Sequence, residues 1–92
     1  MVPMIAVWMK IESDRIADSL REAREKLDTA DGEVVLDFSS VRRIDAPAIK
    51  ALQEFAAAAE EKSVKVALRA VNADVYKVLK LVRLAARFSF VV

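Results

Sequence analysis

The side chains that could do chemistry in this chain gather between residues 37 and 48. Asp37 ends an apolar run, Ser39 and Ser40 follow it, and Asp45 precedes a helix-like run. Two carboxylates that lie close together can act in acid–base catalysis or bind Mg²⁺. The chain has no His, no Cys and only one Gly, so the usual general base, a thiolate and a Gly-rich phosphate loop are missing. We therefore assign no catalytic residue, no metal ligand and no cofactor.

The junction Ile44-Asp45-Ala46-Pro47-Ala48 carries no hydroxyl group. Ala46 offers a methyl group and Pro47 a ring, so neither can be phosphorylated or attack an electrophile. Asp45 is a good helix N-cap, because its carboxylate can accept a backbone N–H bond, and it can equally belong to a partner-binding surface. Both roles stay open. The junction favours a binding module over an enzyme.

Ser39 and Ser40 are the nearest remaining hydroxyls. They can serve as substitute phosphoacceptors, but such residues more often tie a strand end to a loop through side-chain-to-backbone hydrogen bonds. Arg42 and Arg43 flank the junction, and we expect them in solvent, where they can bind an acidic loop of a partner.

The elements that must position these residues alternate between strand and helix patterns. Period-two apolar residues predict a strand over 4–12, and a nearly continuous apolar run predicts a buried strand over 33–38. Between them, Ser13 and Asp14 are good N-caps for a helix to about residue 27. Its predicted inner stripe consists of Ile16, Leu20, Ala23 and Leu27.

The second half of the chain repeats this alternation. Pro47 suits the first turn of a helix to about residue 62, because its missing N–H would have no helical partner. A strand over 64–68 follows, then a helix capped by Asn72 or Asp74 to about residue 81, and a final strand over 88–92. Residues 1–92 are thus predicted to form a single α/β domain, with a mixed sheet and three to four helices.

Composition agrees with a packed domain, since hydrophobic residues are 55% of the chain and charged residues 32%. The absence of Cys fits a reducing compartment. The apolar stretch 1–9 lacks a basic leader, and no segment approaches the roughly 20 apolar residues that span a bilayer. We expect a cytoplasmic protein without membrane insertion.

Charge is distributed unevenly: residues 1–61 hold eight Lys and Arg against thirteen Asp and Glu, whereas residues 62–92 hold seven against one. Such a dipolar chain can steer association with a charged partner or with a copy of itself. If the third helix continues far enough, it carries a basic stripe, more often a solvated face than a functional one, made of Lys77, Lys80, Arg83 and Arg87. Tyr76 is the aromatic residue beside it, so we do not expect nucleic acid as a partner.

Two further features bear on association. Ala56-Ala57-Ala58-Ala59 gives the second helix a small side that either admits another helix or simply favours helix formation. Trp8, on the first strand, either packs in the core or forms a homodimer contact.

The order of elements and several motifs resemble the STAS domain, the fold of bacterial anti-sigma-factor antagonists and of sulfate-transporter tails. The motifs that carry the resemblance are Leu36-Asp37-Phe38-Ser39, Ile44-Asp45-Ala46-Pro47-Ala48, Val64-Lys65-Val66-Ala67-Leu68, and Val78 to Leu84 followed by Phe88. In family members regulated by phosphorylation, a kinase modifies the hydroxyl residue just after the junction Asp. That position is Ala46 here. The following Ser is Pro47, the usual Gly is Ala48, and the family's Gly near Arg83 is missing.

The resemblance implies a non-enzymatic protein-interaction module of the kind found in bacterial regulation of transcription. Its implied partner is an anti-sigma factor kinase or a signalling assembly, without a phosphorylation switch at Ala46. We predict that the partner is bound by the loop and helix around Asp45, through Ser39, Arg42, Arg43, Asp45, Ala46, Pro47, Lys50 and Glu54. The alternative is a STAS subunit of a lipid-type ABC transporter that contacts the ATPase subunit.

Overall fold

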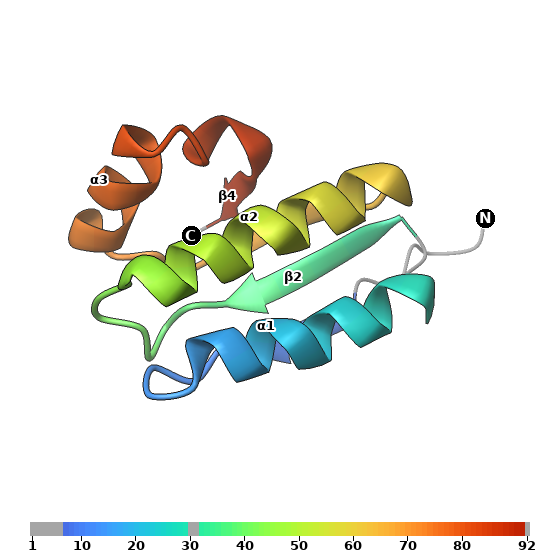
Figure 1. The fold of residues 1–92 in the computed structure, drawn as a ribbon, viewed down its shortest axis with the longest axis horizontal. Coiled ribbons are helices and arrows are strands. Elements are labelled where there is room, and N and C mark those ends of the chain that lie inside the picture. Colours follow the sequence, from blue (N-terminus) through green and yellow to red (C-terminus); the bar gives the residue numbers. More distant parts are fainter. Residues whose placement is uncertain (1–6, 30–31, 92) are drawn as a thin grey trace.

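The computed structural model describes residues 7–29 and 32–91, which form one sheet whose successive strands are connected by helices (Figure 1). The elements, with η for a short 3₁₀ helix, are β1 (Val7–Lys10), α1 (Ile16–Glu25), η1 (Lys26–Thr29), β2 (Glu33–Asp37), α2 (Ala46–Glu61), β3 (Lys65–Arg69), α3 (Ala73–Leu81), η2 (Ala85–Arg87) and β4 (Ser89–Val91). The strands lie side by side in chain order, β1-β2-β3-β4.

All three strand pairings in the described residues are parallel. Parallel neighbours require a crossover connection, and α1, α2 and α3 each provide one. The predicted α/β class with a STAS-like architecture is confirmed. Where we expected a mixed sheet, the described strands pair only in parallel, because each connection contains a helix. The predicted start of the first strand, residues 4–6, lies outside the described residues.

The core lies between one face of the sheet and the two long helices. Val34 and Leu36 on β2, with Val66 and Leu68 on β3, point to this face and are buried, and α1 and α2 cover it (Figure 1). Fully burying one such aliphatic or aromatic side chain contributes about 1.5–3 kcal/mol. The helices contribute Ile16, Leu20, Ala23, Leu52, Phe55, Ala56 and Ala59. The apolar stripe predicted for the first helix is therefore buried.

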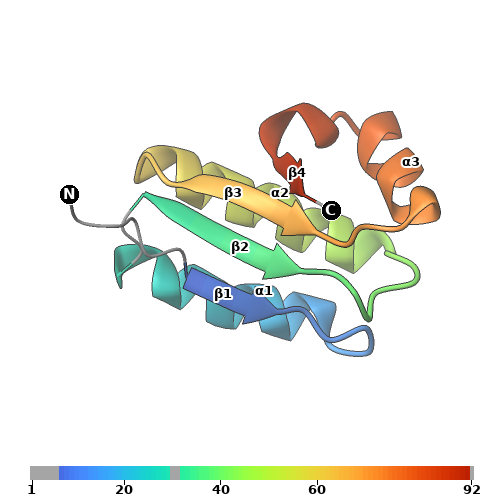
Figure 2. The same ribbon diagram turned by 180° about the vertical axis from the view of Figure 1, so that it is seen from behind.

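The opposite face of the sheet carries no described helix. Seen from behind, the strands lie in front and both long helices lie beyond them (Figure 2). Trp8 is on this open face and has 58% of its surface exposed. Its neighbours along the sheet are Val35 and Ala67.

The start of α1 differs from its prediction. Its N-cap is Arg15, which makes no side-chain cap bond, whereas Ser13 and Asp14 lie in the preceding turn. The predicted caps are therefore wrong, because capping depends on the backbone course of the turn as well as on residue type. The buried hydroxyl of Ser19 stabilises the turn instead, accepting a hydrogen bond from the Glu12 backbone N–H at 3.3 Å.

The end of α3 breaks the predicted basic stripe. The helix ends at Leu81, and Arg83 follows the C-cap with a φ of 63°. The backbone N–H of Arg83 donates to the Lys80 carbonyl, and the N–H of Leu84 donates to the Leu79 carbonyl. These two bonds form a Schellman C-cap, in which the left-handed position favours glycine. Arg87 lies beyond this turn on η2 and pairs with Glu60 of α2 at 2.9 Å, so it does not continue the row.

We predict that Arg83→Gly stabilises the protein by up to about 1 kcal/mol, because the left-handed conformation costs a non-glycine residue that much or more. Chemical denaturation of both proteins measures the change in the free energy of unfolding. Lys80→Gly is the control, and it should destabilise by about 1 kcal/mol, because Lys80 lies in right-handed helix. A destabilised Arg83→Gly protein would contradict the prediction.

Candidate functional site

Asp45 begins α2 as its N-cap. Its Oδ1 atom accepts the Ala48 backbone N–H at 3.0 Å, and Pro47 lies in the first helical turn. The predicted capping role of Asp45 is therefore confirmed. A cap of this kind contributes about 1 kcal/mol. One carboxylate oxygen is thereby committed to the helix, and Asp45 remains exposed to solvent.

The predicted partner-binding residues are all exposed and extend from the loop to the middle of α2. Those on α2 follow one side of the helix, since Ala46, Lys50 and Glu54 are spaced four residues apart, while Leu52 and Phe55 face the core. The exposed residues of the loop and helix, called here the loop–helix surface, are Ser39, Arg42, Arg43, Asp45, Ala46, Pro47, Lys50 and Glu54. Their exposure is a property of the structure; their contact with a partner stays a prediction.

Hydrogen bonds to other segments of the domain hold the loop from Ser39 to Asp45 in place. Ser40 donates its hydroxyl to the Ile11 carbonyl at 3.1 Å, and the Ser39 backbone N–H donates to Asp37 at 3.0 Å. Val41 is buried, and its backbone N–H donates to the Phe38 carbonyl. Ser40 thus has the structural role that its residue type suggests, tying the loop to the segment after β1.

Asn72 connects this loop to α3. Its Oδ1 atom caps α3 by accepting the Val75 backbone N–H at 2.8 Å. Its Nδ2 group donates to the carbonyls of Val41 at 3.2 Å and Arg42 at 3.1 Å. The sequence predicted the cap, but nothing in the local pattern shows that the same amide holds a loop thirty residues away.

Asp37 makes structural contacts at the end of β2. Its Oδ1 atom lies 3.6 Å from Nη1 of Arg69, whereas Asp45 accepts the Ala48 backbone N–H at the start of α2. The hydrogen bond from the Ser39 backbone N–H lowers the pKa of Asp37 most; desolvation opposes this, and the Ser39 hydroxyl, Arg69 and Lys10 lower it further. The carboxylate is therefore ionised near neutral pH and has no proton to donate.

Residues 7–29 and 32–91 contain no group of three or more His, Cys, Asp or Glu side chains arranged to hold a metal ion.

A shallow cleft of about 220 Å³ lies between the starts of α1 and α2. Asp45, Pro47 and Ala48 form its α2 wall. Its α1 wall, which the sequence did not predict, consists of Ser13, Asp14, Arg15, Ile16, Ala17 and Asp18. No local signal marks these residues, because only the packing of α1 against α2 brings them beside Asp45.

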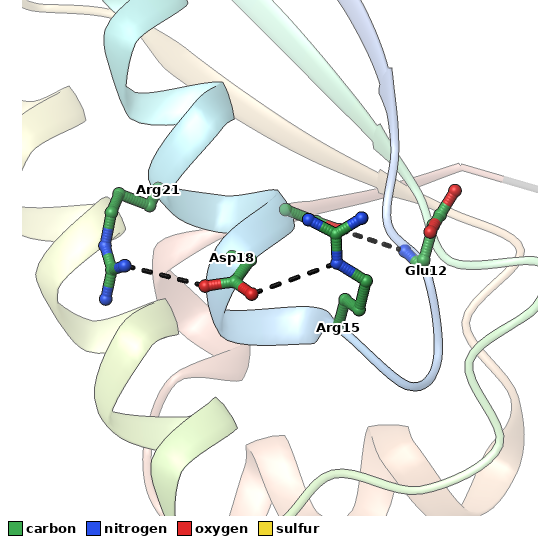
Figure 3. Close-up of polar contacts among 5 residues, drawn as sticks. Glu12, Arg15, Asp18 and Arg21 are labelled. Carbon is green, nitrogen blue, oxygen red and sulfur yellow. Dashed lines mark hydrogen bonds and ion pairs between the residues drawn. The ribbon is translucent and has the colours of Figure 1, made fainter.

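Ion pairs organise the α1 wall. Asp18 lies between Arg15, at 3.8 Å, and Arg21, at 3.5 Å (Figure 3). All three side chains are more than half exposed, so each pair contributes at most about 1 kcal/mol to stability. Of the three, Arg15 and Asp18 line the cleft, so opposite charges lie next to the loop–helix surface.

Comparison with known structures gives the class of fold. The chain is similar to the Thermotoga maritima protein TM1081, described as a candidate anti-sigma factor antagonist. Its solution structure matches with a TM-score of 0.74 and 17% identity over 99% of this chain and 80% of that one, and its crystal structure with 0.64 and 16% over 98% and 74%. A sulfate transporter family protein from Wolinella succinogenes matches with a TM-score of 0.79 and 23% identity over 98% and 80%.

The family model described as "Mlab, STAS domain" matches residues 9–92. The chain therefore belongs to the STAS domain family. No curated protein matches significantly. Among the described residues, no helix has the length and apolar character needed to cross a bilayer.

We predict that Asn72→Asp loosens the loop while keeping α3 capped. A carboxylate still accepts the Val75 N–H but cannot donate to the Val41 and Arg42 carbonyls, and two lost hydrogen bonds cost about 1–2 kcal/mol. Amide hydrogen exchange should be faster at Val41 and unchanged at Val75. Asn72→Ala is the comparison variant, and it should accelerate exchange at both residues. Unaltered exchange at Val41 in both variants would show that Asn72 does not hold the loop.

Proposed function

We propose that this chain is a protein-interaction module that binds an anti-sigma factor kinase or a related signalling assembly through the loop–helix surface. In this proposal the surface is not switched by phosphorylation at Ala46. STAS domains are generally non-enzymatic interaction modules, and one structural neighbour is described as a candidate anti-sigma factor antagonist.

The observation that carries the proposal is that hydrogen bonds hold the loop before Asp45 in place. The loop is anchored by Ser40 and Asn72 and begins a capped helix, so its backbone is held in one form. A surface that is already ordered loses little entropy when a partner binds. Arg42, Arg43 and Lys50 remain exposed and provide charge for recognition.

The lack of a switch follows from residue chemistry at the helix start. A phosphate there would add about −1.5 to −2 charges, but Ala46 and Pro47 have no oxygen to carry it. Pro47 also has its φ restricted to the helical value before the helix forms. The binding surface would therefore stay permanently in an unphosphorylated-like form.

A second candidate is a STAS subunit of a lipid-type ABC transporter that contacts the ATPase subunit. The observation that favours a transporter subunit is the structural match to a protein of the sulfate transporter family, whereas the contact with an ATPase subunit is implied by the family resemblance alone. The same loop–helix surface would serve in this case, so the two candidates differ in partner rather than in site.

The charge on the loop–helix surface should control affinity. Asp45→Asn removes the charge but keeps a good N-cap, and Lys50→Glu reverses a charge on the exposed side of α2. We expect each to weaken binding of the partner by about tenfold, equal to 1.4 kcal/mol. Isothermal titration against an anti-sigma factor kinase encoded beside the gene tests the first candidate, and titration against an adjacent transporter ATPase subunit tests the second.

Lys77→Glu is the matched control, because it makes the same charge change on an exposed residue of α3, away from the surface. Its affinity should equal that of the unaltered protein. Binding that is insensitive to both Asp45→Asn and Lys50→Glu would rule out the loop–helix surface. Binding of neither partner would rule out both candidates.

Protein isolated from its host should carry no phosphate between residues 39 and 54. The hydroxyl of Ser40 is bound to the Ile11 carbonyl, and a phosphate on Ser39 would lie beside the ionised Asp37, which repels it. Phosphopeptide mass spectrometry checks this. Detection of phosphoserine at either position would replace the unswitched surface with a relocated switch.

A further inference from the structure

The open face of the sheet is formed by the strand residues that point away from α1 and α2. Parallel sheets are normally covered on both faces, but no described helix covers this one (Figure 2). It includes the exposed Trp8 and Val91, with 58% and 44% of their surfaces accessible. The other members are Lys10, Glu33, Val35, Asp37, Lys65, Ala67, Arg69 and Ser89.

The strand register orders these side chains into three rows across the sheet. One row is apolar at three of its four positions: Trp8, Val35, Ala67 and Ser89. A charged row, Lys10, Asp37, Arg69 and Val91, lies on one side of it. The pair Glu33 and Lys65 lies on the other side. In both charged rows β2 provides the acid and β3 the base.

The Trp8 side chain covers the centre of the open sheet face. Its ring lies 5.5 Å from the Arg69 guanidinium carbon, although β2 separates the two strands. The Trp8 ring must therefore extend across the sheet above β2, which is consistent with only 6% exposure of Val35 and 3% of Ala67. The open face therefore has a flat aromatic centre, and the row on either side of this centre contains both an acidic and a basic side chain.

We propose that the open sheet face binds a second copy of this chain, related by a two-fold axis that runs parallel to the strands between β2 and β3. Such an axis places β2 of one copy over β3 of the other. Asp37 then faces Arg69 of the second copy, Glu33 faces its Lys65, and the Trp8 rings, which cover Val35 and Ala67, lie between the two sheets. Every charged contact of β2 with β3 is between opposite charges, and each occurs twice.

The charges also exclude the other two-fold axis that could relate two sheets packed face to face. A two-fold axis perpendicular to the strands along the Trp8–Ser89 row would place Asp37 opposite Glu33 and Arg69 opposite Lys65. Like charges juxtaposed across an interface are strongly unfavourable. The order of charges along β2 and β3 thus selects one symmetric pairing, in which the sheets pack face to face at about 10 Å.

The size of the face sets the strength of the dimer. Four strands about 4.8 Å apart, each at most five residues long at about 3.3 Å per residue, give a footprint of roughly 300 Å² per copy. This is below the about 800 Å² per partner of a standard stable interface. The dimer is therefore a weak, reversible one that forms at micromolar to millimolar concentration.

Two charge variants test the pairing without changing the shape of the face greatly. Lys65→Glu with Arg69→Glu makes the β2–β3 charges all acidic, and Glu33→Lys with Asp37→Lys makes them all basic. In sedimentation equilibrium up to about 1 mM, the unaltered chain should dimerise reversibly. Each variant alone should dimerise at least about tenfold more weakly, because like charges face each other. A mixture of the two variants should associate again.

Trp8 gives a second readout that needs no substitution, because it is the chain's single Trp. Its emission should move to shorter wavelength as the unaltered protein is concentrated, and added salt should reverse the shift. Lys77→Glu, at an exposed residue of α3 that belongs to neither proposed surface, is the control and should dimerise like the unaltered chain. Circular dichroism confirms that each variant is folded.

A chain that stays monomeric at about 1 mM with unchanged Trp8 emission overturns the proposal. So does a folded all-acidic variant that dimerises as well as the unaltered chain, or two folded variants that do not associate when mixed. None of these outcomes affects binding at the loop–helix surface, since that surface lies on other elements.

Discussion

The burial of a single face of the parallel sheet under α1 and α2 determines where every other feature lies. Because both helices take the same side, apolar residues alternate toward that side along β2 and β3. The intervening residues, charged ones such as Asp37 and Arg69 among them, are left on the other. The same packing brings the start of α1 against the start of α2 and forms the cleft beside Asp45. Both candidate binding surfaces are consequences of this one arrangement.

Several polar side chains near the loop form hydrogen bonds that hold it in place. Asp45 caps α2, Asn72 caps α3 and binds two loop carbonyls, and Ser40 binds Ile11. A group that is hydrogen-bonded in the folded state loses that stabilisation if it must turn toward a substrate. The anchored loop therefore presents a fixed shape, with exposed arginines and a lysine beside it.

The parts of the fold that depend on local pattern could be predicted from the sequence. The stripe from Ile16 to Leu27, the Asp45 cap and the Pro47 start of α2 follow from periodicity and backbone chemistry, and the structure agrees. The Ser13 and Asp14 caps failed because the turn before α1 leaves Arg15 at the N-cap.

Other features depend on contacts between distant residues. The bonds from Asn72 to the loop span about thirty residues, and the α1 wall of the cleft exists only through helix packing. The basic row failed for a related reason: α3 ends in a left-handed turn at an arginine, where the sequence has no glycine to mark it. Local pattern gives element identity, whereas tertiary contacts decide which surface residues become neighbours.

The two proposed surfaces lie on different sides of the molecule, and this has a consequence for how they can act together. A dimer formed through the open sheet face would leave both loop–helix surfaces free, one on each copy. A dimeric or clustered partner could then be held at two points, and the second contact would form at the high effective concentration set by the first. Because the sheet contact is small, such pairing would depend on protein concentration. A chain whose Ala46 cannot carry a phosphate could thus still bind in a graded way, through assembly rather than through covalent modification.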